Sequence, residues 1–224
     1  MPDLQTLFTA SLLFGLVVTA TFVVVFSDWR MGLFALAAQY VLAAILVLDL
    51  LPYPLPLVRI ISGILALIIF WVTFRQKSSA YRRAIQQAPN DAAREMAHAR
   101  YRSGIFVAGF MFRLFALALA AMGILGIASS VSFLGLSSDI LFGAVWLIAA
   151  GILVAIVSRD VLWLGLGMLM LTSGFTILET AMDPSLLLFG LLNISDLLLA
   201  VVVAHLSTLP VFGTGPRRRR GETE

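Results

Sequence analysis

Residues 186–208 read LLLFGLLNISDLLLAVVVAHLST, an apolar stretch that carries Asn193 and Asp196 near its middle. A bilayer core about 30 Å thick is crossed by roughly 20 apolar residues in an α-helix, so this stretch predicts a transmembrane helix with a carboxylate inside the membrane. Comparable runs precede it at residues 5–26, 31–50, 57–75, 104–127, 139–157 and 161–179. We therefore predict an all-α, polytopic membrane protein with about seven transmembrane helices.

The composition agrees with this class of protein, because 61% of the 224 residues are hydrophobic and only 12% are charged. A soluble globular domain is less apolar and carries about twice that share of charge. The first run is expected to be a span rather than a cleaved signal, since residues 1–5 carry no positive charge. The chain has no cysteine, which excludes disulfides, iron–sulfur ligation and thiolate catalysis.

The basic residues predict the orientation of the chain in the membrane. Lysine and arginine accumulate in cytoplasmic loops, and with seven spans 13 of the 15 basic residues fall on one side. They are Arg30, Arg75, Lys77, Arg82, Arg83, Arg94, Arg100, Arg102, Arg159 and Arg217 to Arg220. This distribution places the N-terminus outside and the C-terminus in the cytoplasm, and it explains the net charge of +3 without nucleic-acid binding.

The predicted domain organisation is a single transmembrane helical domain over residues 1–208 and a basic cytoplasmic tail over residues 209–224. One sizeable polar segment, residues 76–103, interrupts the domain on the cytoplasmic side. Pro89, Asn90 and Asp91 break its helical pattern and are expected to start a second helix. That helix is interpreted either as interfacial or as a solvated linker.

Polar side chains inside the predicted spans are the candidates for a functional site, because ionisable groups in lipid are costly. Arg113 and Asp196 both lie roughly 15 to 18 Å from the cytoplasmic end of their helices, counting about 1.5 Å per residue. Neutral polar residues lie at a similar level. We predict a mid-membrane polar layer, with Arg113 and Asp196 as mutual counter-ions, made of Gln39, Arg113, Thr172, Ser173, Asn193 and Asp196.

Two interpretations of this layer are open. It is either part of a proton or ion pathway, or a buried ion pair that only fixes helix packing. Short glycine spacings, Gly123 with Gly126 and the set Gly165, Gly167 and Gly174, predict close approach of helices.

Several function classes are excluded by the residues themselves. Retinal binding needs a lysine in the last helix, whereas the chain has only Lys77, in a loop. The histidines His98 and His205 lie too far apart in depth to share a haem. The motifs of serine hydrolases, zinc proteases, nucleotide-driven pumps and dinucleotide enzymes do not occur. We expect no cofactor and no catalysis by this chain alone.

The last two spans resemble a known family. The residues that carry the likeness are Ile156 to Leu162 (IVSRDVL), then Gly167 and Gly174, then Asn193 to Asp196 (NISD). This pattern resembles the E component of hydrogenase-4, an enlarged relative of the K subunit of bacterial complex I. The residue-level likeness covers residues 156–207, with a weaker likeness where Trp29 to Gly32 opens the helix that contains Gln39. The family is of about this length and also has about seven spans.

The resemblance implies that Asp196 corresponds to the family's aspartate and that the chain belongs in a prokaryotic cell membrane. The family's glutamate in the preceding helix is replaced by Thr172, and its lysine in the third helix has no counterpart. Proton transfer is therefore either lost in this chain or moved to Asp196 and Arg113.

The resulting expectation is a membrane subunit of a complex-I-like or hydrogenase-like redox assembly, which supports a proton path or a contact between subunits. Its partners would be the lipid bilayer and other membrane subunits. Two alternatives are a stand-alone transporter of a small solute or ion, and a structural scaffold without transport.

Overall fold

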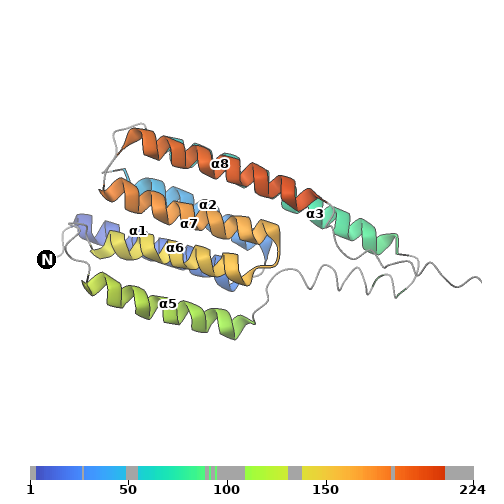
Figure 1. Cartoon of the computed structure of the whole chain (residues 1–224), viewed down its shortest axis with the longest axis horizontal. Coiled ribbons are helices and arrows are strands. Elements are labelled where there is room, and N and C mark those ends of the chain that lie inside the picture. The colour runs from blue at the N-terminus through green and yellow to red at the C-terminus, as the bar shows by residue number, and fades with distance from the viewer. Residues whose placement is uncertain are drawn as a thin grey trace, which may run out of the picture.

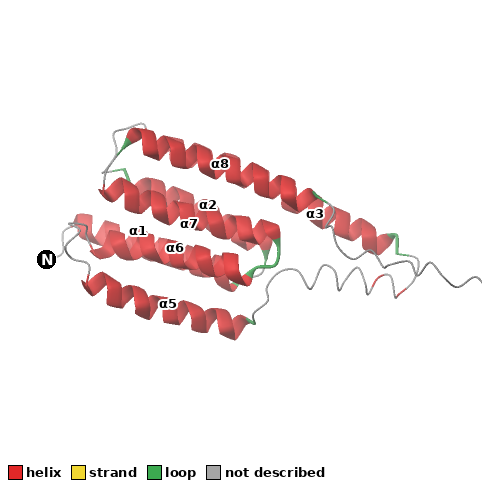
Figure 2. Cartoon of the chain, in the orientation of Figure 1, coloured by secondary structure: helices red, strands yellow, loops and turns green. Residues whose placement is uncertain are grey.

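A computed structural model describes residues 4–26, 28–48, 55–88, 91, 94, 109–130, 138–182 and 185–209. Within these residues the chain is helical, and Figure 2 shows no strand among them. The helices are α1 (Leu4–Val25), α2 (Trp29–Leu46), α3 (Leu55–Gln86), α5 (Phe110–Ser130), α6 (Ser138–Val157), α7 (Val161–Met182) and α8 (Leu186–Thr208). Six of these helices are long and apolar enough to cross a membrane, and α5 has a shorter apolar stretch, Phe110–Gly126. The all-α, multi-pass architecture predicted from hydropathy is confirmed.

The helices form two facing rows with α5 at one edge (Figure 1). One row is α1, α2 and α3, and the other is α6, α7 and α8. Across the rows α1 packs on α6, α2 on α7 and α3 on α8, while α5 packs on α6 and α1. The edges of the bundle are therefore the α3–α8 pair and α5, which Figure 1 shows at opposite sides.

The predicted bounds hold within a few residues except at α3 and α5. The apolar run of α3 ends near residue 75, but the helix continues to Gln86 and projects beyond its neighbours (Figure 1). The first part of the polar segment 76–103 is therefore a continuation of α3. Of the second helix expected in that segment only residues 91 and 94 are described, and the tail with Arg217 to Arg220 lies outside the described residues.

The most extensive contact between described helices is that of α6 with α7. Glycines allow it, because they have no side chain to hold the two backbones apart. A Cβ atom added at Gly167 would lie 2.7 Å from the carbonyl oxygen of Gly151, and one at Gly174 would lie 2.5 Å from that of Ala144. Gly165 in turn faces Val203 of α8 and Phe70 of α3. The predicted role of these three glycines is confirmed. The same prediction is wrong for Gly123 and Gly126, where an added Cβ would meet no atom within 4 Å among the described residues.

Basic side chains gather at one end of the bundle. Lys77 of α3 forms an ion pair of 2.6 Å with Asp160, which precedes α7. Arg30, Arg75 and Arg82 line one groove at the same end. The structure thus brings together basic residues that the sequence assigned to one side, and that this side faces the cytoplasm remains a prediction.

Candidate functional site: a buried arginine–aspartate cluster

The most buried charges of the described chain form an ion pair between α3 and α8. Nη1 of Arg59 lies 2.9 Å from Oδ2 of Asp196, and the two residues are only 1% and 0% exposed. Asp196 is fully buried near the middle of α8, a helix composed mainly of leucine and valine. Because an isolated charge in such surroundings is strongly disfavoured, each member of the pair requires the other.

Hydroxyl groups complete the surroundings of the Asp196 carboxylate. The Tyr40 hydroxyl of α2 donates to Oδ2 at 3.0 Å, and the Thr172 hydroxyl of α7 donates to Oδ1 at 2.5 Å. Both carboxylate oxygens therefore accept hydrogen bonds from side chains of other helices. A buried carboxylate is retained without a large penalty only when its oxygens are satisfied in this way.

The Arg59 guanidinium has three further contacts. Nη2 donates to Oγ of Ser173 at 2.7 Å, and Nη1 is 3.4 Å from Oδ1 of Asn193. The guanidinium also lies over the ring of Tyr40, 4.7 Å from its centroid, which is a cation–π distance. Ser62 adds a hydrogen bond of 2.8 Å to the same Asn193 oxygen. The cluster thus joins α2, α3, α7 and α8.

Local sequence explains how the rings and charges fit together. Gly63 follows Arg59 by one helical turn, and a Cβ atom there would lie 2.6 Å from the Tyr40 ring. The missing side chain lets the ring lie flat against α3, beside the guanidinium. On α8, Asn193 and Asp196 are one turn apart and so share a helix face. Asn193 is fixed by its own bond to the Phe189 carbonyl oxygen at 2.8 Å.

The predicted ion pair between Arg113 and Asp196 is wrong. Arg113 lies in the first turn of α5, where its Nη1 donates to the carbonyl oxygen of Val24 in α1 at 2.9 Å. Helix α5 packs at the edge of the bundle opposite α8 (Figure 1). The prediction failed for two reasons. Helix α5 begins at Phe110 and not near residue 104, so Arg113 lies beside the last turn of α1, whereas Asp196 lies near the middle of α8. The two helices are also separated by the width of the bundle.

Of the predicted polar layer, the structure brings together Thr172, Ser173, Asn193 and Asp196. Three members of the cluster were missed by sequence reasoning: Tyr40, Arg59 and Ser62. Arg59 was recognisable as the one basic residue near the opposite ends of the spans, where the connecting segments contain no lysine or arginine. Its long side chain carries the guanidinium into the bundle.

Gln39 is buried in α2, with 0% exposure, but it is not bonded to the cluster. Among the described residues neither its amide nitrogen nor its amide oxygen has a hydrogen-bond partner. We expect Gln39→Leu to leave the free energy of unfolding unchanged or to raise it by about 1 kcal/mol, because an unsatisfied amide is removed. The matched variant Asn193→Leu, which breaks bonds to Arg59 and Ser62, is expected to lower it by about 2 kcal/mol. Equilibrium unfolding in mixed micelles measures both, and a clear loss for Gln39→Leu would contradict the assignment.

A buried polar stripe extends from the cluster along α7. Thr172, Thr176 and Thr180 succeed one another at one-turn intervals, and Thr176 donates to the Thr172 carbonyl oxygen at 2.8 Å. Glu179 lies on the same face and is only 9% exposed. Hydroxyl and carboxyl groups therefore continue inside the bundle from Asp196 towards the C-terminal end of α7.

The arrangement defines a multi-pass membrane protein with a charged, hydrogen-bonded centre. Among the described residues no group of three or more histidine, aspartate or glutamate side chains is placed to hold a metal ion. No protein-family model matches the chain, and no similar protein is found among curated proteins or solved structures.

Proposed function

We propose that this chain is a non-catalytic membrane subunit of a complex-I-like or hydrogenase-like redox assembly, and that the Arg59–Asp196 cluster forms part of its proton path. The observation that carries the proposal is the Asp196 carboxylate, which is fully buried near the middle of a transmembrane helix and bonded by side chains of α2, α3 and α7. Ionisable residues inside transmembrane segments commonly belong to ion pathways or proton relays. The likeness of residues 156–207 to the hydrogenase-4 E component supports the type of assembly.

The chemistry of the cluster fits proton transfer. A proton relay needs groups that both donate and accept hydrogen bonds, and hydroxyls do both. Tyr40 and Thr172 contact the carboxylate directly, and Thr176, Thr180 and Glu179 continue the polar groups along α7. Asp196 would hold the proton in transit, and Arg59 would balance its charge between transfers. The redox centre that drives transfer would belong to another subunit.

The test is Asp196→Asn in the assembly purified with this chain. The amide keeps the size of the side chain and an acceptor for Arg59 but cannot carry a proton, so we expect proton translocation into proteoliposomes to fall about 100-fold or more. Because the variant leaves Arg59 without its counter-ion, native gels must first show that the assembly is retained, and the loss is assigned to the carboxylate only in assembled protein. The matched control is Asp160→Asn, which makes the same change at the Lys77 ion pair outside the cluster. Unchanged translocation in Asp196→Asn would disprove the role of the carboxylate.

A structural scaffold is the second candidate function. Complete satisfaction of the Asp196 oxygens favours it, since a pair that only fixes helix packing needs the same bonds. In that case the double variant Arg59→Met/Asp196→Leu would keep full activity of the assembly. Solute or ion flux through the chain reconstituted alone would instead favour the stand-alone transporter and contradict both proposals.

A further inference from the structure

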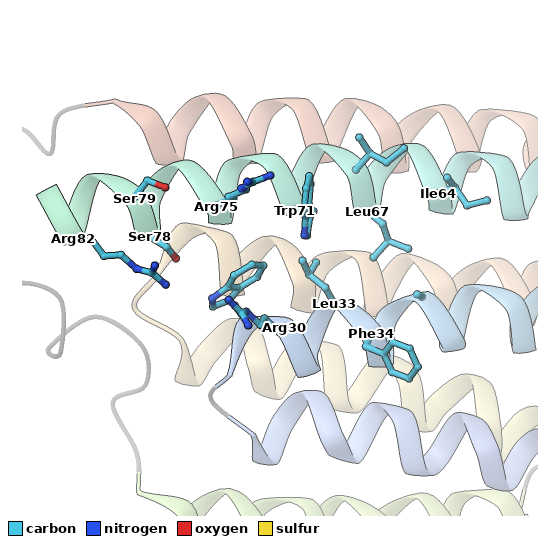
Figure 3. Close-up of a pocket in the computed structure, with 13 residues that line it drawn as sticks. Arg30, Leu33, Phe34, Ile64, Leu67, Trp71, Arg75, Ser78, Ser79 and Arg82 are labelled. Carbon is cyan, nitrogen blue, oxygen red and sulfur yellow. The ribbon is translucent and has the colours of Figure 1, made fainter.

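A groove of about 1120 Å³ lies between α2 and α3 at the basic end of the bundle (Figure 3). Its apolar wall is formed by Leu33, Phe34, Ile64, Leu67 and Ile68. Its rim is polar and is formed by Arg30, Arg75, Ser78, Ser79 and Arg82. In Figure 3 the labelled polar residues of α3 lie along the part of the helix that leads away from Ile64, on the same side as Arg30. One end of the groove can therefore bind a charged group, and the other can bind a hydrocarbon chain.

Two tryptophans mark the boundary between these parts. The Arg30 guanidinium lies over the Trp29 ring, 5.4 Å from its centroid, and the Arg75 guanidinium lies over the Trp71 ring at 5.2 Å. Both tryptophans line the groove. Tryptophan is enriched at the level of the lipid headgroups, because its ring is apolar and its N–H is polar. The level of the arginines is thus the level at which lipid phosphates lie.

The charge of the rim is not neutralised by the described part of the chain. Lys77 on the same helix has a partner in Asp160, at 2.6 Å. By contrast, none of the ion pairs between described residues includes Arg30, Arg75 or Arg82. Three guanidinium groups that share one groove without a carboxylate repel one another and attract an anion. Guanidinium also matches phosphate oxygens with two parallel hydrogen bonds.

We propose that this groove binds one anionic phospholipid of the leaflet at the basic end of the bundle. The phosphate lies among Arg30, Arg75 and Arg82, with the serine hydroxyls as further donors, and an acyl chain lies along Leu33, Phe34 and Ile68. A free phosphate would leave the apolar wall empty, and a zwitterionic lipid would leave the net charge of the rim unbalanced. Basic pockets between transmembrane helices are known to hold anionic headgroups. This site is separate from the Arg59–Asp196 cluster and does not depend on the proposed function.

The experiment is lipid retention by the purified full chain, measured by native mass spectrometry after exchange into nanodiscs with equal amounts of phosphatidylglycerol and phosphatidylcholine of the same acyl chains. We expect one phosphatidylglycerol to be retained preferentially. Each of Arg30→Gln, Arg75→Gln and Arg82→Gln should weaken binding about fivefold, and the triple variant about 100-fold. The control is Arg83→Gln, which removes the same charge from the neighbouring position, a residue that does not line this groove.

A second variant distinguishes a lipid from a free anion. Ala37 lines the groove, and Ala37→Phe places an aromatic ring in it without changing charge. It should lower phosphatidylglycerol retention to the level of the triple arginine variant while circular dichroism shows an intact helical fold. Equal retention of phosphatidylglycerol by the wild type and the triple variant, or equal retention of both lipids by the wild type, would overturn the proposal. Competition by millimolar inorganic phosphate together with normal retention in Ala37→Phe would identify a free-anion site instead and would overturn it as well.

Discussion

Replacement of Arg59 by leucine is expected to destabilise the folded protein by about 3 to 5 kcal/mol. The substitution leaves the Asp196 carboxylate at a position with 0% exposure and removes the cation that lies 2.9 Å away. Tyr40 and Thr172 still donate to the carboxylate, but two neutral hydrogen bonds do not replace an opposite charge in a buried site. The loss should be visible as a shift of the equilibrium unfolding curve in mixed micelles.

A double-mutant cycle separates the ion pair from the general loss of a large side chain. Arg59→Leu/Asp196→Leu should recover most of the stability, because both charges are then absent and the volume is filled by apolar groups. The same cycle with Arg113→Leu in place of Arg59→Leu should give no coupling, because Arg113 lies on α5 and contacts α1 instead. Coupling of Asp196 to Arg113 rather than to Arg59 would contradict the structure.

The fold could be predicted from the sequence because each element is set by one local property. Apolar runs of membrane-spanning length identify the helices, and no long-range information is needed to find them. The error at α3 has the same origin. Hydropathy falls after residue 75, whereas the helix continues to Gln86. An apolar run therefore marks the part of a helix that lies in lipid, and it does not mark the end of the helix itself.

The candidate site could be predicted only in part. The position of a residue along its own helix can be estimated from the sequence, but the sequence does not indicate which helices are neighbours in the bundle. Asn193 and Asp196 share a face of one helix, and Thr172 and Ser173 lie on the preceding helix, so these four were found from spacing alone. The partner cation was not, since Arg113 and Arg59 both offer a guanidinium within a predicted span. Only the packing order of the helices decides between them. Helix α3 pairs with α8, and α5 does not.

The packing of the glycines could likewise not be predicted from their spacing in the sequence. Short spacing occurs both in Gly165, Gly167 and Gly174 and in Gly123 with Gly126. The first set lies where other helices approach, while an added Cβ at either glycine of the second set would meet no described atom within 4 Å. Spacing therefore indicates which helices are able to approach closely, and packing order determines which of them do so.

Gly167→Ala is expected to destabilise the protein by about 3 kcal/mol, at the upper end of the range for overpacking. The added methyl group would lie 2.7 Å from the Gly151 carbonyl oxygen and 2.9 Å from the Ala155 backbone nitrogen. Backbone atoms cannot rotate away as a flexible side chain would, so α6 and α7 must separate. Because α7 also carries Thr172 and Ser173, that separation should disturb the hydrogen bonds to Asp196 and Arg59.

The matched control is the same substitution at Gly123, and it should have the opposite sign. An added Cβ there meets no described atom within 4 Å, so only the higher helix propensity of alanine acts. That effect stabilises an exposed helical position by about 1 kcal/mol. Unfolding in mixed micelles should therefore place the two variants on opposite sides of the wild type. Equal effects of Gly167→Ala and Gly123→Ala would show that the close contact of α6 with α7 does not hold the bundle together.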